Sequence, residues 1–159
     1  MNQRKILIAD EVSDSGLQPL LTAGFLLEKR TKLSADQLIA ALQGCEGLIV
    51  RSETKVTADV LADTPDLRVI GRAGVGVDNI DVPAATARGI VVMNAPDGNT
   101  ITTAEHTMAL LIALARRVPQ ANSSLRSGKW ERKKFVGVEL QEKTPVSYTH
   151  LTLPTKRIV

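Results

Sequence analysis

The chain has 159 residues, of which 43% are hydrophobic and 23% charged, and its formal net charge is +3. This length allows one well-packed domain but not two full ones, and the composition is that of a globular protein. The weak, scattered charge excludes a broad nucleic-acid surface, and no apolar run approaches the roughly 20 residues of a membrane span, so we expect neither partner.

Short apolar runs alternate with helical patterns along the chain. We predict strands over residues 5–9, 25–29, 47–50, 67–70 and 90–93. We predict helices over residues 16–22, 34–42, 57–61, 83–89 and about 102–117, the second opened by a capping box of Ser34 and Gln37. The alternation predicts the fold class α/β, an open parallel sheet of flavodoxin-like or Rossmann-like type with helices on both faces. The last helix is apolar around much of its circumference, so we expect it to be largely buried.

A glycine-rich segment, residues 71–79, follows the fourth predicted strand. Gly71, Gly74 and Gly76 allow close backbone approach and leave N–H groups pointing outward, which suits a carboxylate or phosphate. The segment is not a dinucleotide fingerprint, because no third glycine follows Gly76 at the required spacing. A tight turn without a ligand is the alternative. Ligands of such sheets bind beyond the carboxyl ends of strands, here at Arg51 and Ser52, residues 71–79 and residues 94–99.

Residues 5–144 resemble the D-isomer-specific 2-hydroxyacid dehydrogenases, most strongly over residues 47–56, 71–79 and 128–135. The resemblance implies a substrate pocket in which Arg51 and Lys55 face anionic groups and Ser52 donates a hydrogen bond. Backbone N–H groups of the glycine-rich segment would bind the carboxylate, and Val75 would also lie near the nicotinamide of NAD. The implied substrate-binding residues are Arg51, Ser52, Lys55, Gly74, Val75 and Gly76, and the implied cofactor-binding residue is Val75.

The resemblance also implies a domain organisation. Residues 1–98 would form the N-terminal part of the substrate-binding domain, and residues 99–144 the start of an otherwise absent nucleotide-binding domain, with its first long helix and a dimer arm. The full-length protein would then be a homo-oligomer. The resemblance implies that the family's catalytic Arg, Glu and His, and the main NAD site, lie beyond the residues of this chain. We therefore predict no catalytic residue and no metal site here, and expect the isolated chain to be inactive.

Three further features bear on function. The cluster of Lys129, Arg132, Lys133 and Lys134 beside Trp130 is interpreted as a solvated dimer arm rather than a nucleic-acid site, and the resemblance also allows it a phosphate-facing role. His106 is expected to be a structural or surface residue. The single cysteine, Cys45, excludes an internal disulfide and suits a reducing compartment, so with no basic-then-apolar leader we expect a cytoplasmic protein.

The last segment, residues 145–159, differs in character from the rest of the chain. It has no helical or strand period and contains the only tyrosine, Tyr148. Residues 146–155 back-translate without strain to a sequence that resembles the transposon-end adapter of sequencing libraries. We predict that this segment is a non-native tail, and therefore assign neither Tyr148 nor His150 to a site.

The sequence also allows functions other than that of a dehydrogenase. A signalling receiver domain has the same alternating topology, but it requires an aspartate at the end of the third strand, where this chain has Arg51. A non-catalytic anion-binding module remains open. Within the family, dehydrogenases of glycerate, lactate or formate are alternatives, but Arg51, Lys55 and residues 129–135 favour a phosphorylated 2-hydroxy acid as the small-molecule substrate.

Overall fold

The computed structural model describes residues 4–145. This part of the chain divides after Gly98 into two compact units, each of which is described by itself. Apart from Pro145, the segment predicted to be a non-native tail lies outside the described residues.

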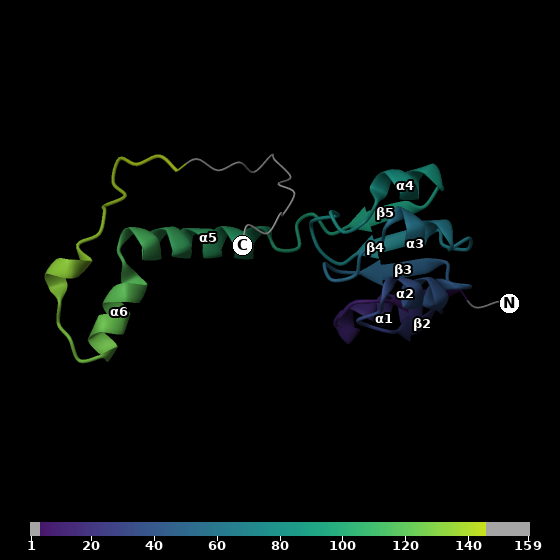
Figure 1. Ribbon diagram of the computed structural model, residues 1–159, viewed down its shortest axis with the longest axis horizontal. Coiled ribbons are helices and arrows are strands. Elements are labelled where there is room, and N and C mark those ends of the chain that lie inside the picture. Colours follow the sequence, from purple (N-terminus) through teal and green to yellow (C-terminus); the bar gives the residue numbers. More distant parts are fainter. Residues whose placement is uncertain (1–3, 146–159) are drawn as a thin grey trace. The chain divides into compact units, whose positions relative to one another are not determined.

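The first unit is built on a five-stranded sheet of order β2-β1-β3-β4-β5, in which every neighbouring pair is parallel (Figure 1). The strands are β1 Lys5–Ile8, β2 Leu26–Lys29, β3 Gly47–Val50, β4 Val69–Arg72 and β5 Val91–Asn94. The predicted fold class is confirmed, and the strand order is the flavodoxin-like one. The fourth strand begins two residues later than predicted, so that Gly71 and Arg72 belong to the sheet and not to the following loop.

Four helices connect these strands: α1 Asp14–Thr22, α2 Ala35–Leu42, α3 Ala58–Ala62 and α4 Val82–Ala87. The predicted capping box is present, since the Gln37 N–H donates to Ser34 Oγ at 3.3 Å and the Ser34 N–H donates to Gln37 Oε1 at 2.9 Å. Gly24 and Gly89 follow α1 and α4 with φ of 84° and 71°, the left-handed conformation that ends many helices. Local signals therefore place these helices where they occur.

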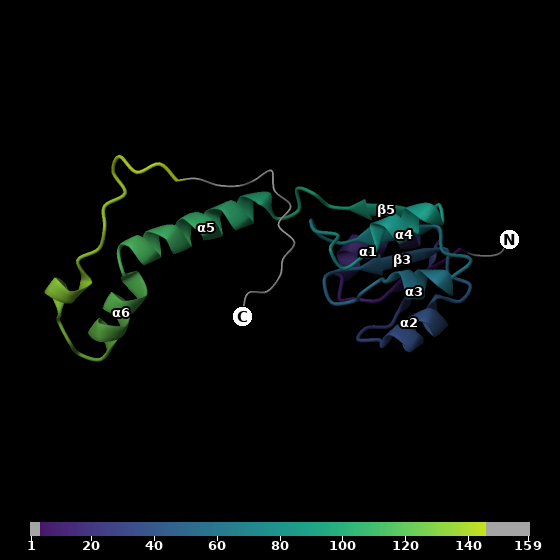
Figure 2. The same ribbon diagram turned by 45° about the horizontal axis from the view of Figure 1, so that its top comes forward.

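Helices lie on both faces of the sheet (Figure 2), which separates two clusters of buried apolar residues. Helices α2, α3 and α4 cover one face, where Leu7, Leu48 and Ile70 from the strands are buried in the main core. Helix α1 covers part of the other face and packs its Leu17 against Ile6 and Ile8. Alternate residues of one strand thus point to opposite layers, as the pleat requires. Both layers hold the strands rigidly, which fixes the positions of the loops at their carboxyl ends.

The second unit contains α5 Thr100–Ala115, α6 Val118–Arg126 and a 3₁₀ helix, Arg132–Phe135. The prediction of one helix reaching residue 117 is wrong at its end, because Arg117 has φ of 52° and breaks it. Pro119 explains the break: a proline cannot donate to the carbonyl four residues earlier and clashes with it. That carbonyl, Ala115 O, accepts a hydrogen bond from the Val138 N–H at 2.8 Å instead.

Helix α5 is exposed, which contradicts the expectation that it is largely buried. No residue of α5 is buried within the described range, and the exposed fractions of Leu110 and Leu114 are 57% and 76%. Its apolar residues lie around most of the helix, whereas the rest of this short unit can cover only a small part of that surface. Composition alone therefore indicated a helix that needs packing partners and could not say whether these residues supply them. No helix in residues 4–145 is long and apolar enough to cross a membrane.

Candidate functional site

Three of the predicted site residues lie in the turn after β3. Arg51, Ser52 and Lys55 are exposed, whereas Thr54 between them is buried. The side chains that could bind an anion therefore reach solvent from a backbone that is anchored beneath them. This turn stands at the carboxyl edge of the sheet beside the end of β1. The chain leaves β1 toward β2 on one side and returns to β3 on the other, which makes this edge the topological switch point where such folds bind ligands.

Asp10, which follows β1, anchors the turn through hydrogen bonds. The residue is only 2% exposed. Oδ2 accepts hydrogen bonds from the N–H groups of Arg51 at 2.5 Å and Thr54 at 3.2 Å, and Oδ1 accepts one from Thr54 Oγ1 at 2.6 Å. A buried carboxylate is tolerated when hydrogen bonds satisfy its oxygens, and here three do so.

Asn79 anchors the same turn from the neighbouring loop. Its Nδ2 donates to Arg51 O and to Thr54 O, each at 2.7 Å. Backbone hydrogen bonds continue the connection, because the Val56 N–H donates to Asn79 O and the Asp81 N–H donates to Val56 O, both at 2.8 Å. The structure therefore joins the Arg51 turn to the end of the glycine-rich segment.

The glycine-rich loop is held at both sides. The Ala73 N–H donates to Val50 O at 2.8 Å, and Asn94 Nδ2 donates to Val75 O at 2.7 Å. The Gly74 N–H donates within the loop, to Arg72 O at 2.8 Å, so in this conformation it is not directed to a ligand. Val75 lies between these anchors with 38% of its surface exposed.

Sequence analysis missed Arg72, the last residue of β4. Its guanidinium lies against Gly74, where a Cβ would stand 1.7 Å from the nearer Nη, and its Nε is buried with no hydrogen-bond partner among the described residues. Arg72 and Val50, which precedes Arg51, are paired in register, so both cations come from adjacent strand ends. The sequence does mark this residue, because it is a cation within a glycine-rich segment at the end of a strand. Asp10, Thr54 and Asn79 were missed as anchors because no local pattern marks them.

A cavity of about 360 Å³ lies next to the turn. Lys55 and Lys32 line it together with Asp10, Glu53 and Thr54. Of the six predicted substrate-binding residues only Lys55 borders this cavity. The cavity therefore does not by itself define the predicted site. Within residues 4–145 no group of three His, Cys, Asp or Glu side chains could hold a metal ion.

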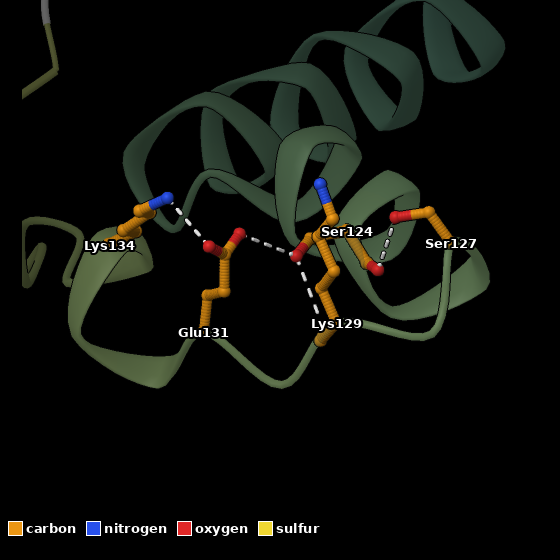
Figure 3. A network of polar contacts seen from close by, with 5 residues as sticks. All are labelled: Ser124, Ser127, Lys129, Glu131 and Lys134. Carbon is orange, nitrogen blue, oxygen red and sulfur yellow. Dashed lines mark hydrogen bonds and ion pairs between the residues drawn. The ribbon is translucent and has the colours of Figure 1, made fainter.

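In the basic cluster of the second unit, Glu131 pairs with one of the cations (Figure 3). Its carboxylate accepts a hydrogen bond from Lys134 Nζ at 2.6 Å and lies 3.1 Å from Ser124 Oγ. The Lys134 hydrogen bond, assisted by Ser124, holds the pKa of Glu131 below its ordinary value. Lys129, Arg132 and Lys133 are exposed, as are Trp130 and, on α5, His106. One of the four cations, Lys134, thus pairs with Glu131 within this unit.

Comparison with known proteins identifies the family. Residues 6–155 match the family described as D-isomer specific 2-hydroxyacid dehydrogenase, catalytic domain, and the chain belongs to this family. The match includes residues 145–155, part of the segment predicted to be non-native, whose origin stays a prediction.

The chain is 52% identical over 140 residues to D-3-phosphoglycerate dehydrogenase of Archaeoglobus fulgidus, covering 88% of this chain and 27% of that protein. Among solved structures, the TT0316 protein of Thermus thermophilus has a TM-score of 0.75 at 33% identity, covering 86% of this chain and 46% of that one. The NAD⁺-bound 3-phosphoglycerate dehydrogenase of Entamoeba histolytica has a TM-score of 0.64 at 28% identity, covering 72% and 40%. The chain therefore spans about a quarter of the length of its curated relatives.

Proposed function

We propose that this chain is the N-terminal part of an NAD-dependent D-3-phosphoglycerate dehydrogenase. Such an enzyme oxidises 3-phosphoglycerate to 3-phosphohydroxypyruvate, the first step of serine biosynthesis. The observation that carries the proposal is the 52% identity to the Archaeoglobus fulgidus enzyme over 140 residues, which include the Arg51 turn and the glycine-rich loop. A cytoplasmic location fits this metabolic role and the reduced, buried Cys45.

The proposed substrate site lies at the carboxyl edge of β3 and β4. Arg51 and Lys55 bind the anionic groups of the substrate, and Ser52 donates a hydrogen bond to one of them. Backbone donors of residues Gly74, Val75 and Gly76 bind the carboxylate, which requires the loop to turn the Gly74 N–H away from Arg72 O. Arg51, Ser52 and Lys55 are all exposed on a turn whose backbone is anchored, which supports these roles.

We infer that the main site for NAD is absent from the described residues. Its pyrophosphate is usually cradled by a glycine-rich turn between a strand and a helix, and the turn between β1 and α1 contains Asp10, Glu11 and Val12 instead. Val75 remains the one proposed contact, near the nicotinamide. Without a pyrophosphate site the isolated chain is expected to form no NADH from 3-phosphoglycerate. NADH formation by this chain alone would contradict the expected inactivity of the isolated chain.

We assign residues 1–98 to the substrate-binding domain and residues 99–144 to the start of the nucleotide-binding domain, with residues 145–159 as a non-native tail. The full-length protein is proposed to be a homo-oligomer. The exposed apolar surface of α5 supports an assembly in which further protein covers this helix.

Sequencing the source DNA across codons 140–170 tests the tail: a strand followed by Gly-x-Gly-x-x-Gly after Thr144 is expected. If residues 146–159 are encoded as written, the non-catalytic anion-binding module becomes the better interpretation.

A chimaera tests the enzymatic proposal directly. Residues 1–144 replace the corresponding segment of the Archaeoglobus fulgidus enzyme, and NADH formation from 3-phosphoglycerate is measured. We expect activity, with kcat/KM reduced about 10- to 100-fold by Arg51→Ala, the cost of about 1.5–3 kcal/mol for a hydrogen bond to a charged group. Arg88→Ala is the control, because Arg88 is an exposed cation at the end of α4, away from the carboxyl edge. A folded but inactive chimaera, or equal effects of the two substitutions, would refute the assignment.

A further inference from the structure

The Arg51 turn is clamped between two side chains that come from different parts of the chain. Asp10 binds its N–H groups from the end of β1, and Asn79 binds its carbonyl groups from the end of the glycine-rich loop. Both backbone polar groups of Arg51 are bound: its N–H donates to Asp10, and its C=O accepts from Asn79. The clamp therefore fixes the backbone from which the exposed Arg51 and Lys55 side chains project.

The orientation of the Asn79 amide follows from its partners. Two carbonyl oxygens lie 2.7 Å from Nδ2, so this atom must be the NH₂ group that donates to both. The other amide atom, Oδ1, is buried and has no hydrogen-bond partner among the described residues. An unsatisfied buried acceptor costs about 1–3 kcal/mol. The free-energy cost of the unsatisfied Oδ1 is therefore accepted at Asn79, while the two N–H donors of Nδ2 connect adjacent loops.

We infer that Asn79, together with Asp10, is a positioning residue of the proposed anion site. It sets the Arg51–Lys55 turn against the loop that carries Gly74–Gly76 and does not touch the ligand itself. A doubly anionic ligand must contact both segments at once, so fixing their separation before binding removes an entropic cost from the binding step. This inference rests on the proposed function, which supplies the ligand.

The test uses the full chain and measures the Kd of 3-phosphoglycerate by titration of backbone amide signals. Asn79→Asp preserves the shape of the side chain and removes both donors, and Asn79→Ala removes the amide. We expect either substitution to weaken binding about tenfold. At the same time, hydrogen exchange of the Arg51 and Thr54 amides in the ligand-free chain is expected to become at least about tenfold faster, as for a local opening.

Gln43→Ala is the matched control. The Gln43 side-chain amide also donates to two backbone carbonyls, Ile39 O at 3.0 Å and Asp63 O at 2.9 Å, but it does so at the ends of α2 and α3, at the opposite edge of the sheet. We expect Gln43→Ala to lower the unfolding midpoint without changing the Kd. A Kd changed equally by both positions, or by neither, would overturn the inference.

The outcomes separate this inference from the function on which it rests. If the chain binds 3-phosphoglycerate, and Arg51→Ala weakens that binding whereas the Asn79 variants bind normally, the positioning role is wrong and the proposed function stands. If the chain does not bind 3-phosphoglycerate at all, the site proposed for it is wrong. In that case unchanged exchange of the Arg51 and Thr54 amides in Asn79→Ala would refute the clamp as well, whereas faster exchange would retain it as a coupling of the two loops.

Discussion

Gly137 lies so close to the end of α5 that no other residue fits there. An ideal Cβ at this position would stand 2.2 Å from Ala115 O and 2.7 Å from Arg116 Cα, both backbone atoms that cannot rotate away. The contact accompanies the hydrogen bond from the Val138 N–H to Ala115 O, which replaces the helical bond that Pro119 cannot make. Gly137 therefore closes the corner between α5 and α6.

We predict that Gly137→Ala destabilises the second unit by about 1–3 kcal/mol, the usual cost of overpacking. Trp130 is the only tryptophan of the chain and belongs to this unit, so its fluorescence during urea unfolding reports the effect. Gly98→Ala is the control, because its Cβ would meet nothing closer than Ala95 O at 3.4 Å. Equal midpoints for the two variants would contradict the prediction.

Cys45 is a buried thiol in the first unit. It is 0% exposed within the main core, and burial raises its pKa above the ordinary value because the thiolate would be desolvated. A thiol reagent should therefore react only when the unit opens. For an unfolding free energy of about 5 kcal/mol, labelling at pH 8 should be on the order of 10³-fold slower than in urea. Comparable rates in the native and unfolded chain would show that this core is not formed.

At the scale of elements, β1 and β2 are joined across their register by the Lys5–Glu28 ion pair. The hydrogen bond from Lys5 lowers the pKa of Glu28, and the same bond raises the pKa of Lys5. A depressed carboxyl pKa contributes stability that is present above the unfolded-state value, about 4.3, and is lost as the pH falls through the folded-state value. A raised lysine pKa contributes stability that is present below about 10.4 and is lost as the pH rises through the folded-state value.

Both side chains are about a quarter exposed, so we expect the pair to contribute no more than about 1 kcal/mol. As the pH is lowered below 5, the unfolding free energy should fall less steeply in Glu28→Gln than in the wild type, as measured by urea titration at each pH. Glu46→Gln is the matched control, since its partner Arg4 lies at 3.7 Å and both side chains are more exposed. An identical pH dependence in the wild type and in Glu28→Gln would refute the role of this pair.

At the scale of the whole molecule, the unequal packing of the two units has a measurable consequence. Ile101, Leu110 and Leu114 on α5 are each more than half exposed, and an apolar surface of this kind promotes association. We predict concentration-dependent self-association in sedimentation experiments, reduced by Leu110→Glu with Leu114→Glu. Leu21→Glu is the control, because Leu21 is an apolar residue of α1 that is 50% exposed in the other unit. A monomer at all concentrations would contradict the prediction.

The order of strands and helices in the first unit could be predicted because each element carries its signal within a few residues. The capping box at Ser34 and the left-handed glycines after α1 and α4 act over one helical turn, whatever the rest of the fold does. The predictions were wrong where contacts between residues distant in the sequence determine the structure. The end of α5 depends on Val138 as well as Pro119, and the exposure of α5 depends on what packs against it.

The amino-acid sequence by itself thus determined the fold class and pointed to the cations and glycines of the candidate site. Alternation of apolar runs and the chemistry of strand ends are local properties of the chain. Only the tertiary structure decided what holds that site. Asp10 reaches Thr54 across 44 positions and Asn79 reaches Arg51 across 28, and these separations become hydrogen-bond distances only when parallel strands bring their carboxyl ends to one edge of the sheet.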